Sequence, residues 1–196
     1  MTATLLALCA FAYLSGAIPW PVWLGRAFYG VDVRTVADGN PGAANAYRVG
    51  GWRLGAAALL LDFFKAFVPA FIARWAVDLP GEQLLAVALL PTVGHAFSVF
   101  LRFRGGRALT TMFGAWSGLT LYEVPLVMGG AAIAATLALK SDALRALSVP
   151  VAALIYVTLA GKPAWMLALA VAQIAVLGAK LIAHALSAPR PSKVAP

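Results

Sequence analysis

The sequence predicts an all-α integral membrane protein, a bundle of about seven transmembrane helices with glycine-rich cytoplasmic loops. Hydrophobic residues make up 62% of the 196 residues, whereas soluble domains average about 45–50%. Charged residues make up only 11%, against about 25% in soluble domains. Apolar runs of about 16 to 25 residues follow one another with short polar breaks, and such runs are long enough to cross a bilayer as helices.

Seven apolar runs are expected to form the spans. In chain order they are Ala3–Leu24, Leu54–Ala76, Gln83–Leu101, Ala108–Tyr122, Val124–Leu139, Ala146–Ala160 and Ala164–Ala185. The fourth and sixth runs are short, so six spans remain an alternative. Residues 1–186 are expected to form a single transmembrane domain, and residues 187–196 a short cytoplasmic tail. The sequence indicates no particular oligomeric state.

The first run is expected to be a retained helix that breaks near Pro19 and Pro21, because proline lacks a backbone N–H and disrupts helix interiors. A signal peptide is not expected, since no Lys or Arg precedes the run and the positive n-region is therefore missing. Cys9 is the only cysteine, which excludes an internal disulfide and a cysteine-based zinc framework. We expect no metal site and no cofactor.

The basic residues predict the orientation of the chain. An odd number of spans with the N-terminus outside places twelve of the fifteen Lys and Arg residues in the cytoplasm, as the positive-inside rule expects. The expected location is therefore the inner (plasma) membrane of a bacterial cell, with the C-terminus cytoplasmic. Topology accounts for most of the net charge of +8, and nucleic-acid binding is not expected. The twelve basic residues expected in the cytoplasm are Arg26, Arg34, Arg48, Arg53, Arg102, Arg104, Arg107, Lys140, Arg145, Lys180, Arg190 and Lys193.

The longest polar region is the expected first cytoplasmic loop, residues 26–53. One interpretation is a solvated connection in which glycine and asparagine serve the turns. The other is a loop folded back into the bundle, with N–H groups, amides and guanidinium groups around an anion. Arg102-Phe103-Arg104-Gly105-Gly106-Arg107 supports the second interpretation, because three close arginines repel one another unless an anion compensates. Such arginines can also set the orientation of the chain or bind lipid phosphates. A glycine pair just before a helix, however, favours a site for phosphate.

Three ionisable residues are expected inside spans. Asp62 and Lys65 are three residues apart on one helix, so they can pair and reduce the cost of each charge in hydrocarbon. His95 is either a hydrogen-bonded packing group or a member of the site. No nucleophile motif or metalloprotease motif is present. A reaction here would therefore depend on positioning and electrostatics, with the nucleophile supplied by a substrate.

Four motifs in order resemble the bacterial membrane acyl-phosphate:glycerol-3-phosphate acyltransferase family. They are Gly16-Ala17-Ile18-Pro19, then Gly39-Asn40-Pro41-Gly42-Ala43-Ala44-Asn45 with Arg48, then Asp62-Phe63-Phe64-Lys65, then Gly94-His95 with Phe103-Arg104-Gly105-Gly106-Arg107. The resemblance covers about half the chain, and more weakly the rest. It implies seven helices and the transfer of a fatty acyl group from acyl-phosphate to the 1-hydroxyl of glycerol 3-phosphate, giving lysophosphatidic acid.

The resemblance also implies which residues form the site. Catalytic roles are implied for His95, Asn45 and Arg107. Binding of the substrates, glycerol 3-phosphate and acyl-phosphate, is implied for Arg34, Asn40, Gly42, Arg48, Lys65, Arg104, Gly105, Gly106 and His184. Membrane lipids are the other expected partners.

Several residues depart from the family pattern. Ala17 and Ala44 stand where the family has hydroxyl side chains, and Arg107 stands for lysine. Asp38 replaces a serine, and we expect it to pair with Arg34 or Arg48, because an unpaired carboxylate would repel a phosphate. Two alternatives therefore stay open: a member that has lost turnover and acts as a binding or partner subunit, and a small-solute transporter.

Overall fold

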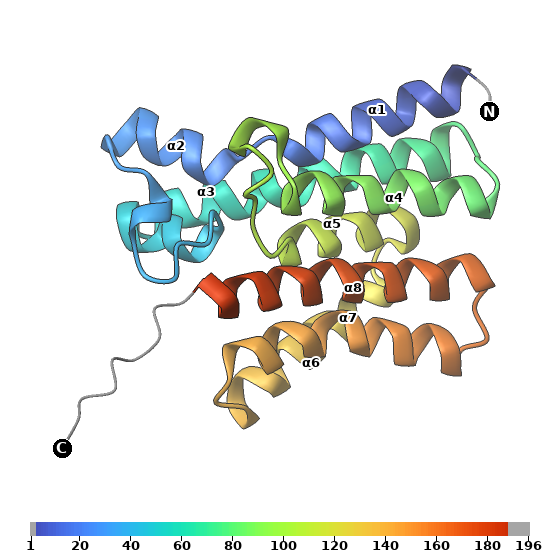
Figure 1. Cartoon of the computed structure of the whole chain (residues 1–196). Coiled ribbons are helices and arrows are strands. Elements are labelled where there is room, and N and C mark those ends of the chain that lie inside the picture. The colour runs from blue at the N-terminus through green and yellow to red at the C-terminus, as the bar shows by residue number, and fades with distance from the viewer. Residues whose placement is uncertain (1–2, 188–196) are drawn as a thin grey trace.

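A computed structural model describes residues 3–187 of the chain, and these residues form helices and loops without a strand (Figure 1). Short 3₁₀ turns, η1 (Val33–Thr35) and η3 (Val99–Leu101), lie in the two longest loops, and a π-helical turn, η2 (Ile72–Ala76), extends α3. The α-helices are α1 (Ala3–Ala17), α2 (Trp20–Tyr29), α3 (Ala43–Phe71), α4 (Gly81–Ala96), α5 (Leu109–Thr120), α6 (Glu123–Ala138), α7 (Asp142–Leu159) and α8 (Ala164–Ser187).

The described residues thus contain eight α-helices, or seven if the bent pair α1–α2 is one unit, close to the expected seven. By length and composition, α3, α4, α7 and α8 can each cross a membrane, and α1–α2 can do so as a pair bent by 43°. Of the two remaining helices, α5 has 12 residues and α6 has 16. The sixth expected span is longer than the sequence indicated, because α7 begins at Asp142, where Ser141 accepts a hydrogen bond from the Leu144 N–H as its N-cap.

The predicted break in the first span lies at Ile18 and Pro19, between α1 and α2. A break frees backbone carbonyls, which need new partners in a membrane. The Ser98 hydroxyl donates to the Ala17 carbonyl, and the Lys65 ammonium donates to the Ile18 carbonyl at 2.9 Å. Residues from two other parts of the chain therefore stabilise the bend.

The expected loop 26–53 is largely helical, which corrects the sequence interpretation. Helix α2 continues to Tyr29 and α3 begins at Ala43, so the connection is only residues 30–42. The run after Gly42 contains three alanines, the residue with the highest helix propensity. Gly50 and Gly51, which lie in the region expected to be a loop, instead kink α3, since Gly51 has φ +65°, a conformation that residues other than glycine rarely adopt.

Glycines bring helix backbones into direct contact at two crossings. An added Cβ on Gly94 in α4 would lie 2.8 Å from the Ala17 N of α1, and one on Gly118 in α5 would lie 2.6 Å from the Phe67 carbonyl oxygen of α3. An added Cβ on Gly16 would lie still closer to the Pro91 backbone, and one on Gly114 still closer to the Phe63 backbone. Gly114 and Gly118 are four residues apart, the spacing that lets membrane helices approach closely.

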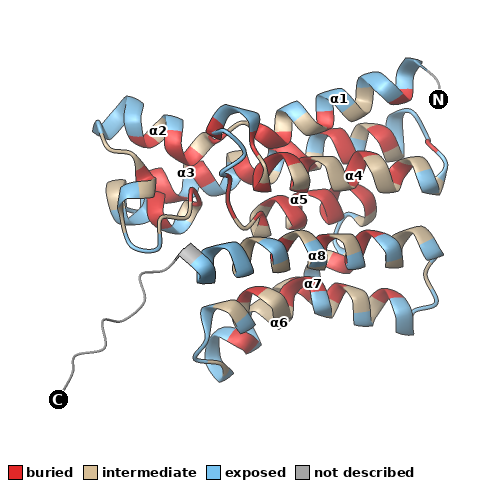
Figure 2. Ribbon diagram, in the orientation of Figure 1, coloured by how far each residue is buried: buried red, intermediate tan, exposed pale blue. Residues whose placement is uncertain are grey.

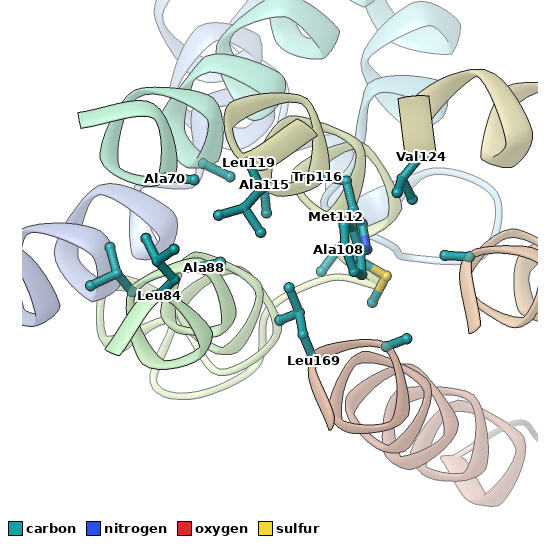
Figure 3. Close-up of a cluster of buried hydrophobic side chains, with 14 of the residues drawn as sticks. Ala70, Leu84, Ala88, Ala108, Met112, Ala115, Trp116, Leu119, Val124 and Leu169 are labelled. Atoms are coloured by element: carbon teal, nitrogen blue, oxygen red, sulfur yellow. The ribbon is translucent and has the colours of Figure 1, made fainter. Parts of the chain in front are cut away.

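The centre of the bundle is an apolar cluster in which α5 lies between its neighbours (Figure 3). The buried Trp116 indole donates to the Gln173 side chain of α8 at 2.8 Å, so the largest core side chain keeps its polar atom satisfied. Burial decreases outward, and the outer faces of α6, α7 and α8 are exposed, as lipid-facing surfaces are (Figure 2).

The two polar loops, residues 30–42 and 97–108, meet at one end of the bundle together with the end of α8 (Figure 1). The N-terminus of α1 lies at the opposite end. Apart from Ser187, which ends α8, the expected tail 187–196 lies outside the described residues.

Candidate functional site

The turn at residues 102–108 folds back against the end of α4. The Gly105 N–H donates to the Ala96 carbonyl at 3.2 Å and the Gly106 N–H donates to the His95 carbonyl at 3.1 Å. Arg102, Phe103 and Ala108 all have positive φ angles. The two glycine N–H groups, which the resemblance assigned to phosphate binding, therefore cap the last carbonyls of α4 in this conformation.

The loop before α3 is held by the buried side chain of Asn45. Its amide nitrogen donates to the Val36 carbonyl at 3.1 Å, the Asn40 carbonyl at 3.0 Å and the Asp38 carboxylate at 3.0 Å. Its oxygen accepts from the Arg48 guanidinium at 2.8 Å. Asn45 and Arg48 thus shape the loop that presents Asp38 and Asn40.

Asp38 pairs with Arg107 across the two loops, at 2.8 Å. The prediction that Asp38 pairs with Arg34 or Arg48 is wrong. Arg34 forms an ion pair with Asp32, and Arg48 donates a hydrogen bond to Asn45. The Arg107 N–H also donates to the Asn40 Oδ1 at 3.2 Å. These two contacts join the polar loops, although 66 residues lie between Asn40 and Arg107 in the sequence.

Both loop carboxylates are held in the charged form. Partial burial opposes ionisation of Asp38, but the Asn40 N–H, the Arg107 charge and the Asn45 amide together lower its pKa. The hydrogen bonds and charge of Arg34, with help from Arg26, hold the pKa of Asp32 well below its ordinary value. A lowered carboxyl pKa stabilises the fold above the ordinary value of about 4, and this stabilisation is lost as pH falls through the lowered value. At neutral pH both carboxylates are ionised.

A cavity of about 640 Å³, called here the loop cavity, opens where the two loops meet α8. Four basic residues line it, and Asp38 is the one carboxylate among the described lining residues. The wall also includes the rings of Phe97 and Phe103. A cavity of this size with several cations and an apolar wall suits a small phosphorylated ligand joined to an apolar group. The basic residues are Arg104, Arg107, Lys180 and His184.

His95 lies directly behind the Gly105–Gly106 turn and is almost fully buried. Its Nδ1 is 3.2 Å from the Thr111 hydroxyl at the start of α5 and 3.8 Å from the Asp62 carboxylate. The predicted pairing of Asp62 with Lys65 is confirmed, with 2.7 Å between Nζ and Oδ1. A small cavity of about 10 Å³ is lined by Lys65, His95 and Gly106, so these groups support the turn from the inside of the bundle.

The structure brings together only part of the predicted site. Gly42 is the N-cap of α3, and Arg34 lines a neighbouring cavity. The sequence did not single out Lys180, which is one of several lysines flanking a span. In the structure, its ammonium group lies 5.3 Å from the centre of the Phe97 ring, and it lines the loop cavity. The predicted residues that line the loop cavity are Asn40, Arg104, Gly105, Arg107 and His184.

A model of the glycerol-3-phosphate acyltransferase family matches residues 6–187. The chain belongs to this acyltransferase family. Among curated acyltransferases of the family, one from Thermotoga maritima is 42% identical over 62% of the chain and 60% of its own length. One from Anaeromyxobacter sp. (strain Fw109-5) is 50% identical over 56% of the chain and 55% of its own length. The chain thus matches little more than half the length of these relatives.

Solved structures of this acyltransferase family extend the similarity to nearly the whole fold. PlsY (YgiH), an integral membrane glycerol 3-phosphate acyltransferase in its glycerol 3-phosphate form, superimposes with a TM-score of 0.85 at 29% identity, covering 94% of this chain and 93% of that chain. The lysophosphatidic acid form superimposes with a TM-score of 0.82 at 26% identity. Together with its own apolar helices, this similarity identifies the acyltransferase-family chain as a multi-pass membrane protein.

Proposed function

We propose that this chain transfers a fatty acyl group from acyl-phosphate to the 1-hydroxyl of glycerol 3-phosphate. The products are inorganic phosphate and lysophosphatidic acid, and the latter is used in phospholipid synthesis. The observation that carries the proposal is the loop cavity, in which cations from the turn at residues 102–108 and from α8 surround a space walled by Phe97 and Phe103. The solved relatives are named for a glycerol 3-phosphate form and a lysophosphatidic acid form, which supports the same ligand chemistry here.

The proposed reaction needs no protein nucleophile. The hydroxyl oxygen of glycerol 3-phosphate bonds to the acyl carbon, the bond from that carbon to the phosphate oxygen breaks, and the hydroxyl proton leaves with inorganic phosphate. The cations of the loop cavity stabilise the negative charge that develops on the acyl oxygen and the leaving phosphate. Arg107 and Lys180 are placed for this role, because they reach the cavity from different elements.

The direct test is incubation of the purified chain with acyl-phosphate and labelled glycerol 3-phosphate, with lysophosphatidic acid as the measured product. Formation of the product supports the acyltransferase. A second candidate, a binding subunit without turnover, is favoured by the Asp38–Arg107 pair, because the carboxylate occupies a cation that a phosphate needs. Binding of glycerol 3-phosphate without product formation would support that second candidate.

We also propose that the chain lies in the bacterial inner membrane with the loop-cavity end in the cytoplasm and the N-terminus outside. In a Cys9→Ser background, a single cysteine at position 40 should react with an impermeant thiol reagent only after the cytoplasmic side is opened. A single cysteine at position 80, in the loop between α3 and α4, should react from outside in intact cells. Reversed labelling, or labelling of both positions from one side, contradicts this orientation.

Replacing Asp38 by serine, the family residue, should lower the KM for glycerol 3-phosphate by about two- to fivefold, since a partly exposed ion pair contributes modestly. The carboxylate competes with substrate phosphate for Arg107, and its removal frees that guanidinium. The decrease should be largest at low salt, where charges are least screened.

The matched control is Asp142→Ser, because Asp142 pairs with Arg145 at 3.1 Å outside the loop cavity, and its KM should not change. A raised KM or a lowered kcat for Asp38→Ser would mean that Asp38 orients Arg107 productively. An unchanged kcat/KM would mean that neither account holds.

A further inference from the structure

A second cavity of about 510 Å³ adjoins the loop cavity, and the two share Arg104 as a common wall. We call it the arginine cavity. Its lining comes from α2, the loop before α3, and the turn around η3. Four of the eight lining residues are arginines, and they are Arg26, Arg34, Arg102 and Arg104.

The charges of the arginine cavity are only partly compensated. Asp32 accepts from Arg26 at 2.7 Å and from Arg34 at 2.7 Å, so one carboxylate serves two guanidinium groups. The guanidinium groups of Arg102 and Arg104 make no ion pair or hydrogen bond to any part of the chain that the structure describes. Four positive charges against one negative charge leave a surplus of three, which a phosphate can offset through charge-assisted, bidentate hydrogen bonds.

The remaining wall is apolar and continuous with the outer surface of the bundle. Trp23 and Phe100 line the cavity, their rings meet edge to face at 5.6 Å, and both side chains are exposed. Exposed aromatic residues near the end of a membrane helix lie at the level of the lipid headgroups. A ligand here can therefore place an anion among the arginines and an apolar chain against Trp23 and Phe100.

We propose that the arginine cavity binds the phosphate group of an anionic phospholipid, separately from the loop cavity. Arginines beside membrane spans also set the orientation of the chain, but that role does not require several of them to line one cavity. Arg53, at the same end of α3, illustrates the difference: its guanidinium lies over the exposed Trp52 ring at 5.6 Å and outside the arginine cavity. A phosphomonoester headgroup fits best, because its two negative charges come closest to the surplus.

The test is a native mass-spectrometry titration of the purified full chain with dioctanoyl phosphatidic acid, compared with zwitterionic dioctanoyl phosphatidylcholine. Phosphatidic acid should bind, and both Arg26→Gln and Arg102→Gln should weaken its binding by about tenfold, the range for one hydrogen bond to a charged group. Arg53→Gln, the matched control, should not weaken binding. Lys180→Gln, which changes the loop cavity alone, should leave this binding event in place.

Inorganic phosphate distinguishes the two sources of the anion. If millimolar phosphate fails to displace phosphatidic acid, the apolar wall contributes and the lipid is the ligand. If it displaces the lipid completely, the cavity is a free-phosphate site and the lipid assignment is wrong. Equal binding of both lipids, or unchanged binding by Arg26→Gln and Arg102→Gln, also overturns the proposal. Arg26 is exposed on α2, so its variant gives a result even if the Arg102 variant misfolds.

Discussion

Replacing Gly105 by alanine is expected to lower acyl transfer by about 100-fold, because even a displacement of about 1 Å at a site has that effect. An added Cβ would overlap the carbonyl oxygen of His95 and lie 2.8 Å from the carbonyl oxygen of Ala96. Both atoms are backbone, so no side-chain rotation relieves the clash. The turn must move away from α4, which displaces Arg104 and Arg107 on either side of it.

The measurements are the acyl-transfer rate and the thermal midpoint of the purified variant. Gly129→Ala in α6 is the matched control, since nothing lies within 4 Å of its added Cβ and alanine favours a helix interior. This control should keep full activity and at least the parent's stability. Wild-type activity and stability in the Gly105 variant would show that the turn is not fixed by its contact with α4.

Replacing Lys65 by methionine is expected to reduce the yield of folded protein severely. The change leaves the Asp62 carboxylate buried without its partner at 2.7 Å and the Ile18 carbonyl without its donor at 2.9 Å. Breaking a buried pair in this way costs roughly 3–5 kcal/mol in soluble proteins. The thermal midpoint and the size-exclusion profile of the purified variant measure the loss.

The double variant Asp62→Asn with Lys65→Met should recover part of that stability, because it removes the unpaired charge. Recovery should stay incomplete, since the Ile18 carbonyl at the break between α1 and α2 still lacks a donor. Lys162→Met is the control, as its pair with Glu123 joins the loop before α8 to the start of α6 and is partly exposed. A Lys65 variant that folds normally but has no activity would instead place Lys65 in the site.

The sequence predicted the features that depend on local chemistry. Pro19 marked the break in the first span, and the spacing of Asp62 and Lys65 indicated their pair. The start of α3 was missed because Gly50 and Gly51 are typical of loops. Only the structure shows that Asn45 satisfies the loop carbonyls and that the glycine pair forms a kink inside a helix.

The partner choices in the site depend on tertiary packing, which residue spacing does not encode. Asp38 was expected to pair with an arginine close in sequence, but the fold places Arg107 nearer. Lys180 has no motif around it, and only the packing of α8 beside α4 brings it to the loop cavity.

The shortness of α5 determines the depth at which the polar chemistry takes place. Its 12 residues rise only about 18 Å, whereas the hydrocarbon layer is about 30 Å thick. Its amino end lies deeper in the bundle than the amino end of α3 and the carboxyl end of α8 (Figure 1). A long-chain donor can meet this end while its tail stays dissolved in the bilayer. Under the proposed function, the water-soluble reactant then has to reach this end through the loop cavity, which both loops line.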